Sequence, residues 1–307
     1  MLTNFKNLKE LMSRYSDDNV CRAYLEQVRW NGNPVCPHCK EHKPYKLNDG
    51  KKYRCRNINC KKNFTVTVGL VFENTKIPLS TWFAAIYLVT AHKKGISSHQ
   101  LARDLGVTQK TAWFLNHRIR ETFANESHAQ LDNIVEMDET FIGGKWRNMT
   151  KKKRAEARQI GDNKVPVMGI LERGGKASLK VMKSLDSFQD LILSHVKPTA
   201  VVVTDSHPAH IGIEESFKGH ILINHSNDEY TNGIYHTNTV EGFFSMLKRG
   251  VYGIYHHVSP KHLHRYCEEF AYRYNYRGIK DNERFVLTLQ NSNGRLKYRE
   301  LISKKRA

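Results

Sequence analysis

The chain has 307 residues, with 49 Lys and Arg against 30 Asp and Glu and a formal net charge of +19. This length allows one large domain with one or two small ones. No apolar run approaches the roughly eighteen residues of a membrane span, and the opening Met1–Lys6 is unlike a signal peptide. We therefore expect a cytoplasmic protein without a membrane partner, and its basic excess indicates an acidic partner such as nucleic acid.

Residues 1–30 are predicted to form a helical lead-in, because apolar residues recur there at helical spacing. A zinc ribbon is predicted next, over residues 31–75. Its ligands would be two cysteine pairs separated by fifteen residues: Cys36, Cys39, Cys55 and Cys60. This spacing is typical of a closed, four-thiolate structural zinc site. His38 and His42 could each replace a thiolate, although four thiolates already complete the zinc shell.

Residues 76–130 are predicted to hold three helices. A short helix ends at Gly106, and a capped helix with polar and basic residues in its first turn follows. This order is that of a helix-turn-helix, in which Gln109, Lys110 and His117 would face DNA. An ordinary three-helix subdomain without a DNA contact is the alternative.

Residues 131–280 alternate between strand and helix patterns and predict an α/β domain. The expected order is a strand over 133–142, a hairpin, a helix, a continuous apolar strand over 199–205, a further strand and a helix from Asn238. A strand so apolar is expected to be covered on both faces. This order is that of a mixed-sheet, RNase H-like domain. Residues 281–307 are expected to form a basic C-terminal tail.

The helix over 238–250 is predicted to present Glu241 and Lys248 on the same face, since seven residues are close to two helical turns. A carboxylate and a cation projecting together could serve metal-assisted chemistry on phosphates. Asn238 and Glu241 also fit an N-terminal capping box, in which Glu241 would only accept a backbone hydrogen bond.

Three carboxylates stand at positions that chemistry could use: Asp138 in the first strand, Asp205 at the end of the apolar strand, and Glu241 on the helix. An aspartate that ends such a strand is costly unless it has a partner, and carboxylates are ligands for Mg²⁺. We expect two such ions, Mg²⁺ or Mn²⁺, with Asp138 bridging both and Asp205 and Glu241 holding one each. Glu136 shares the strand face of Asp138 and is a rival ligand, whereas Glu139 points to the opposite face.

Three motifs together resemble the zinc-ribbon DDE transposases of bacterial insertion sequences, relatives of the Merlin transposons: Met137–Thr140, Val203–Ser206 and His236–Gly250. The segment Arg29–Cys39 is similar to that family as well. The resemblance covers nearly the whole chain and implies that Asp138, Asp205 and Glu241 bind the catalytic metal, with Lys248 as the associated basic residue. After Asp205 the chain reads Ser-His-Pro-Ala-His, where relatives often carry a glycine and an aromatic residue.

The resemblance implies binding to the terminal inverted repeats of an element, metal-dependent strand cleavage, and attack of the freed 3′-hydroxyl on target DNA. It also implies a homodimer or larger multimer on DNA, located with the bacterial nucleoid. We expect Arg249, the residue after Lys248, to contact DNA too. Two other functions remain open: a DNA-binding regulator whose α/β domain only oligomerises, and a nuclease of the same fold that stops at hydrolysis.

Overall fold

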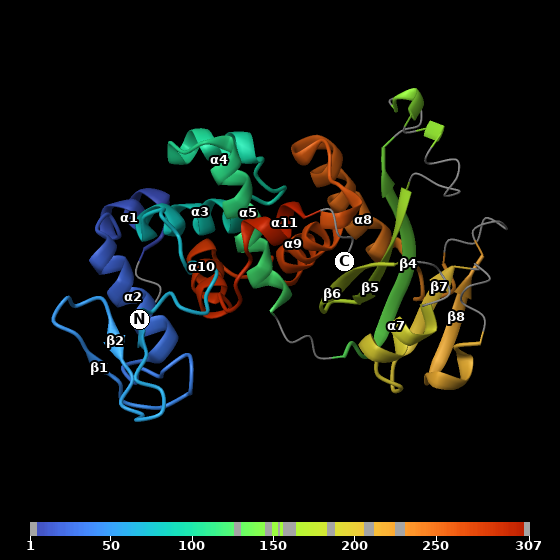
Figure 1. Ribbon diagram of the computed structural model, residues 1–307. Coiled ribbons are helices and arrows are strands. Elements are labelled where there is room, and N and C mark those ends of the chain that lie inside the picture. The colour runs from blue at the N-terminus through green and yellow to red at the C-terminus, as the bar shows by residue number, and fades with distance from the viewer. Residues whose placement is uncertain are drawn as a thin grey trace. The chain divides into compact units, whose positions relative to one another are not determined.

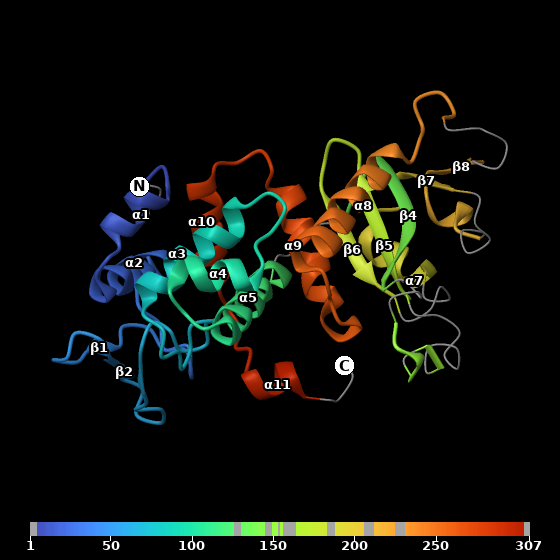
Figure 2. The same cartoon turned by 90° about the horizontal axis from the view of Figure 1, so that it is seen from above.

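The computed structural model describes residues 5–125, 130–144, 149–152, 154–155, 164–182, 188–205, 212–224 and 231–303. The chain divides into two compact units (Figures 1 and 2). The first contains residues up to 126 together with residues 278–306, and the second contains residues 127–277. The second unit is therefore inserted in sequence between two parts of the first.

The first unit consists of helices and one small sheet. Its helices are α1 (Leu8–Arg14), α2 (Asp18–Trp30), α3 (Leu79–Ala91), α4 (Ser98–Leu105), α5 (Gln109–Ala124), α10 (Asp281–Gln290) and α11 (Tyr298–Ile302). Its sheet is antiparallel, with the order β1 (Tyr45–Lys46), β2 (Tyr53–Arg54) and β3 (Asn63–Phe64). After Phe64, the last residue of β3, the chain turns.

Helices α4 and α5 are delimited by capping residues. Ser97 caps α4 by accepting from the amide of Gln100, Gly106 ends α4 in the left-handed conformation, and Thr108 caps α5. Helix α3 has Pro78 at its N-cap and so no capping side chain there, and Ser80 lies inside the helix. Its backbone amide donates instead to Asp18 at 3.2 Å, so a side chain from α2 satisfies the start of α3.

Residues 281–302, expected to belong to a tail, instead contain the helices α10 and α11. Helix α10 packs on α2, α3 and α5, and it buries an apolar stripe that includes Phe285, Val286 and Leu289. The ring of Phe285 lies 5.3 Å from that of Phe83 in α3. Although residues 281–307 are basic in composition, α10 is an amphipathic helix, and its apolar side packs in the core of the first unit.

The second unit is built on a mixed five-stranded sheet in the order β6-β5-β4-β7-β8. Its strands are β4 (Ile134–Gly143), β5 (Lys164–Glu172), β6 (Ala177–Val181), β7 (Val201–Asp205) and β8 (Gly219–Ile223). Strands β4, β5 and β6 are antiparallel neighbours, whereas β7 is parallel to both β4 and β8. The predicted mixed α/β organisation is confirmed, including the hairpin of β5 and β6.

Helices cover the two faces of this sheet (Figure 2). Helix α7 (Phe188–His195) packs on one face, where Val135, Met137 and Val202 are buried. Helices α8 (Asn238–Gly250) and α9 (Leu263–Asn275) pack on the other face, over Val167 and Leu171. Because side chains alternate along a strand, Glu136 and Asp138 lie on the α8 face.

Helix α8 continues into a single π-helical turn, Val251–Tyr255, at the point where it meets α9. Gly250 is buried there, and a Cβ atom at this position would lie 1.9 Å from Cζ of the fully buried Phe270. The close packing of α8 on α9 therefore requires a residue without a side chain.

We expect Gly250→Ala to lower the free energy of unfolding of the second unit by about 1–3 kcal/mol, since the ring of Phe270 would have to move within a packed core. Gly242→Ala is the matched control, because Gly242 is exposed on the same helix with no atom within 4 Å of a built Cβ. This control should gain about 0.5–1 kcal/mol from helix propensity. Urea unfolding followed by circular dichroism measures both, and equal effects from the two variants would contradict the packing described.

Candidate functional site

Asp138 and Asp205 are brought together by the parallel pairing of β4 and β7. The pairing runs through Ile134 with Val201 and Glu136 with Val203. Two residues further along the same register are Asp138 and Asp205. Both are partly exposed and lie on the α8 face of the sheet, because Val202 belongs to the opposite face. The two aspartates therefore project side by side at one edge of adjacent strands.

Helix α8 is held close to this position by Gly169, the partner of Asp138 on β5. A Cβ at Gly169 would lie 2.7 Å from ring atoms of Phe244 and 2.8 Å from Cγ2 of Val240. The missing side chain lets the apolar face of α8 rest directly on β5. Glu241, next to Val240 in the first turn of α8, is thereby placed near the two aspartates, although nothing in the sequence marked Gly169 for this role.

The three carboxylates interact electrostatically. Burial raises the pKa of Asp138 to about 7, and the negative charges of Asp205, Glu139 and Glu241 contribute to the rise. The backbone N–H of Glu139 donates to Oδ1 of Asp138 at 2.8 Å, and this hydrogen bond acts to lower the pKa of Asp138. A cation between these groups would relieve the repulsion, so the donor set fits a divalent metal ion bound by oxygen ligands.

Glu241 is not needed to start α8. The helix N-cap is Thr237, one residue before the cap expected from sequence, and its side chain makes no capping bond to the backbone. The Thr237 hydroxyl instead donates to Oε1 of Glu241 at 3.1 Å. The amides at the start of the helix bind a carboxylate from another element, Glu136, so the capping-box alternative for Glu241 does not hold.

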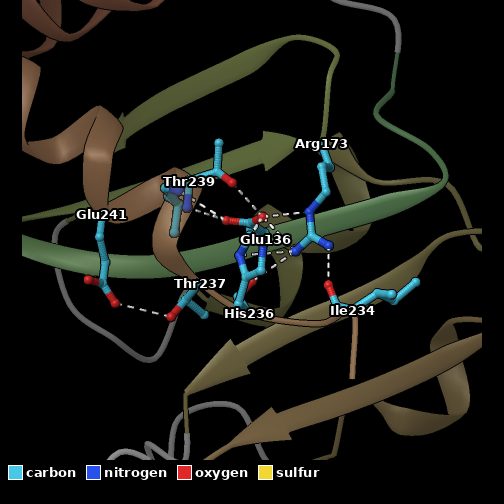
Figure 3. A network of polar contacts seen from close by, with 8 residues as sticks. Glu136, Arg173, Ile234, His236, Thr237, Thr239 and Glu241 are labelled. Carbon is cyan, nitrogen blue, oxygen red and sulfur yellow. Dashed lines mark hydrogen bonds and ion pairs between the residues drawn. The ribbon is translucent and has the colours of Figure 1, made fainter. Parts of the chain in front are cut away.

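Glu136 proves to be an anchor and not an exposed ligand (Figure 3). It is fully buried, and Oε2 accepts from the amides of Thr239 at 2.9 Å and Val240 at 3.1 Å. Its Oε1 accepts from the Thr239 hydroxyl at 2.8 Å and from two nitrogens of Arg173, Nε at 2.9 Å and Nη2 at 2.7 Å. The sequence indicated the strand face of Glu136 but not these partners.

The four cysteines are positioned to hold a metal ion in the first unit. All four sulfur atoms lie within 4.8 Å of one another: Cys36, Cys39, Cys55 and Cys60. The Sγ atoms of Cys39 and Cys55 are 3.4 Å apart, and those of Cys36 and Cys60 are 3.9 Å apart. Four thiolates around one zinc ion would be spaced by about 3.8 Å. In the described part of the chain, no other group of three or more Cys, His, Asp or Glu is as close.

The remaining candidate residues differ in exposure. Lys248 and Arg249 are exposed on α8, and Gln109 and Lys110 are exposed in the first turn of α5. His117 is completely buried, with its ring 4.5 Å from that of Trp113. The expectation that His117 faces DNA is therefore wrong, because the stretch of α5 that contains it lies inside the unit.

The raised pKa of Asp138 predicts a pH-dependent cost in stability. A folded-state pKa above the ordinary value means that the neutral carboxyl is favoured on folding, so stability is lost as the pH rises from about 4 to about 7. In buffer without divalent ions, Asp138→Asn should therefore stabilise the protein by about 1–3 kcal/mol at pH 8. The gain should be smaller at pH 5.

Thermal unfolding at the two pH values measures this effect, and Asp132→Asn provides a control of opposite sign. The Thr199 hydroxyl, the Asn133 amide and Lys197 lower the pKa of Asp132, so Asp132→Asn should destabilise the protein at pH 8. An Asp138→Asn variant that is less stable than the wild type at pH 8 would contradict the electrostatics described.

Helices long and apolar enough to cross a bilayer are absent from the described residues.

Residues 130–275 match the ISXO2-like transposase domain, and this match contains Asp138, Asp205, Glu241 and Lys248. Residues 16–63, with all four cysteines, match the transposase zinc-ribbon domain. A protein of Halobacterium salinarum described as an uncharacterised protein in transposable element ISH50 is 26% identical over 266 residues, which cover 81% of this chain and 88% of that protein. The sequence motifs, the cysteine cluster and both matches agree: the chain carries regions similar to the transposase zinc-ribbon domain and the ISXO2-like transposase domain.

Proposed function

We propose that this chain is a transposase that binds the terminal inverted repeats of its element and catalyses metal-dependent cleavage followed by transfer of the 3′-hydroxyl end to target DNA. The proposal is supported by the strand pairing of β4 with β7 and by the negative charges of Asp205 and Glu241, which act on the carboxyl of Asp138. A protein that only bound DNA would not need these mutually repelling carboxylates close together.

The fold supports the same proposal. Numbered along the chain within the large sheet, the strand order is 3-2-1-4-5, with the second strand antiparallel to the first and the last two parallel to it. We assign this arrangement to the RNase H-like class. We also assign α4, the turn at Gly106 and α5 to a helix-turn-helix, in which Gln109 and Lys110 lie on the exposed first turn.

In the proposed site, the three carboxylates would bind metal ions and Lys248 would bind DNA. Two divalent ions, Mg²⁺ or Mn²⁺, would activate the attacking oxygen and stabilise the leaving oxygen when bound. Asp138, Asp205 and Glu241 would hold these ions through their carboxylate oxygens. Lys248, exposed two turns beyond Glu241, would position a DNA phosphate.

The other parts of the chain would serve DNA binding. The zinc ribbon would hold one structural zinc ion, and Arg249 would contact the DNA backbone beside Lys248. We propose that a dimer or larger multimer forms on the transposon ends and that the protein is associated with the nucleoid in the cytoplasm. The net charge of +19 supports a strongly salt-dependent affinity for DNA.

The test incubates the protein and Mg²⁺ or Mn²⁺ with a labelled duplex that carries the element's own end, together with a target plasmid. The proposal expects cleavage at the end and covalent joining of the labelled strand to the plasmid. Cleavage without joining would instead indicate a nuclease. Salt-dependent binding without any cleavage would indicate a regulator.

A further inference from the structure

We propose that Glu136 and Arg173 act as a positioning pair, which fixes the first turn of α8 and with it Glu241 relative to Asp138. This inference rests on the proposed function of the three carboxylates and concerns residues that would not touch the metal. Figure 3 shows the pair between β4, the hairpin after β5 and the start of α8.

Glu136 replaces the capping side chain that α8 lacks. A helix leaves its first amides without intrahelical partners, and a side-chain oxygen from the N-cap residue normally accepts from the second or third of them. In α8 these amides belong to Thr239 and Val240, and Oε2 of Glu136 accepts from both, at 2.9 and 3.1 Å. The negative charge also interacts favourably with the positive end of the helix dipole.

Arg173 neutralises the buried charge of Glu136 and also hydrogen-bonds to the segment that leads into α8. Its guanidinium binds Oε1 of Glu136 through Nε and Nη2. The same group donates to the carbonyl of His236 at 3.1 Å and to the carbonyl of Ile234. Its own backbone amide donates to the Ile134 carbonyl at 2.9 Å, at the beginning of β4. Arg173 is thus hydrogen-bonded both to strand β4 and to the segment that leads into α8.

The position of the pair gives it a role in the site. Glu136 is two residues before Asp138 on the same face of β4, and Thr239 is two residues before Glu241 in α8. The contact between Glu136 and Thr239 therefore fixes the separation of two proposed metal ligands that are 103 residues apart in the chain. Residues that orient metal ligands in this way typically change metal affinity by about 10–100-fold when they are replaced.

The experiment compares Glu136→Gln with the wild type in Mn²⁺ binding, measured from the electron paramagnetic resonance signal of free Mn²⁺. Gln keeps the size of Glu but loses the charge and offers the amides a single acceptor oxygen. Mn²⁺ affinity should fall by about 10-fold or more. DNA cleavage should need correspondingly more Mn²⁺ for half-maximal rate but reach a near-normal rate at saturation, because Glu136 does not contact the metal.

Two further variants separate positioning from stability. Lys180→Gln removes another partly buried ion pair of the same unit, Lys180 with Glu268 at 3.1 Å between β6 and α9. It should lower the melting temperature without changing Mn²⁺ affinity by more than about 2-fold. Arg173→Lys keeps the positive charge but cannot reproduce the paired guanidinium bonds. This variant should show an intermediate loss of affinity, and it serves as the test if Glu136→Gln does not fold.

Hydrogen exchange at the amides of Thr239 and Val240 gives a readout that is independent of metal. Protection should decrease in Glu136→Gln and persist in Lys180→Gln. If the wild type binds no Mn²⁺, the proposed function fails, while lost protection would still assign the pair to the start of α8. Unchanged protection in Glu136→Gln, or unchanged Mn²⁺ affinity in a folded variant when the wild type binds the ion, would overturn the inference.

Discussion

Asp205→Asn is expected to bind a transposon end as tightly as the wild type but to yield neither cleaved nor joined product. An amide of the same size keeps the packing at the end of β7 but loses the negative charge that would hold a divalent ion opposite Asp138. We expect the cleavage rate to fall by at least about 10³-fold, which corresponds to about 4 kcal/mol in the activation free energy. Gel electrophoresis of the labelled duplex, with binding followed separately in the absence of metal, measures both properties.

Asp190→Asn is the matched control for this variant. Asp190 is exposed in α7, on the opposite face of the same sheet, so this substitution should leave cleavage and joining unchanged. Product at the wild-type level from Asp205→Asn would remove Asp205 from the site. A parallel loss of activity in both variants would point to general damage to the domain.

Cys36→Ser is expected to abolish zinc binding and unfold the zinc ribbon. The ribbon has a small core, in which Tyr53, Phe64 and two of the cysteines are buried. A structural zinc ion typically contributes about 10 kcal/mol or more to the folding of so small a module. We therefore expect a zinc-to-protein ratio near zero, loss of hydrogen-exchange protection over β1–β3, and weaker DNA binding. Protection in β4, β5 and β7 of the second unit should persist.

His38→Ala tests whether the zinc ligands are four thiolates. His38 lies between Cys36 and Cys39 and is exposed, and the four sulfurs alone form the compact group. This variant should retain one zinc per chain and the protection of β1–β3. Loss of zinc from His38→Ala, or an ordered ribbon in zinc-free Cys36→Ser, would show that the centre is built differently.

Parts of the fold followed from local patterns in the sequence. The apolar run ending at Asp205 predicted a strand covered on both faces, and Val202 and Val203 of β7 are both fully buried. Gly106 marked the end of α4, since glycine readily adopts the left-handed conformation found there. The cysteine spacing likewise predicted the compact sulfur cluster.

What the sequence did not predict depends on contacts between distant segments. Glu136 was assigned to the correct face, but its role depends on amides about a hundred residues later. His117 was expected at the DNA surface because the helices that pack on α5, including α10 from the end of the chain, cannot be inferred from the pattern of α5 alone. The segment from 281 was expected to be a tail because of its many charged residues, although α10 within it has an apolar stripe that is buried.

The central claim is that Asp138, Asp205 and Glu241 together hold divalent metal ions. The most direct measurement is anomalous diffraction at the manganese absorption edge from crystals of the protein with a transposon-end duplex and Mn²⁺. We predict peaks within coordination distance of carboxylate oxygens from all three residues. Manganese bound elsewhere in those crystals, with no peak beside these carboxylates, would contradict the claim.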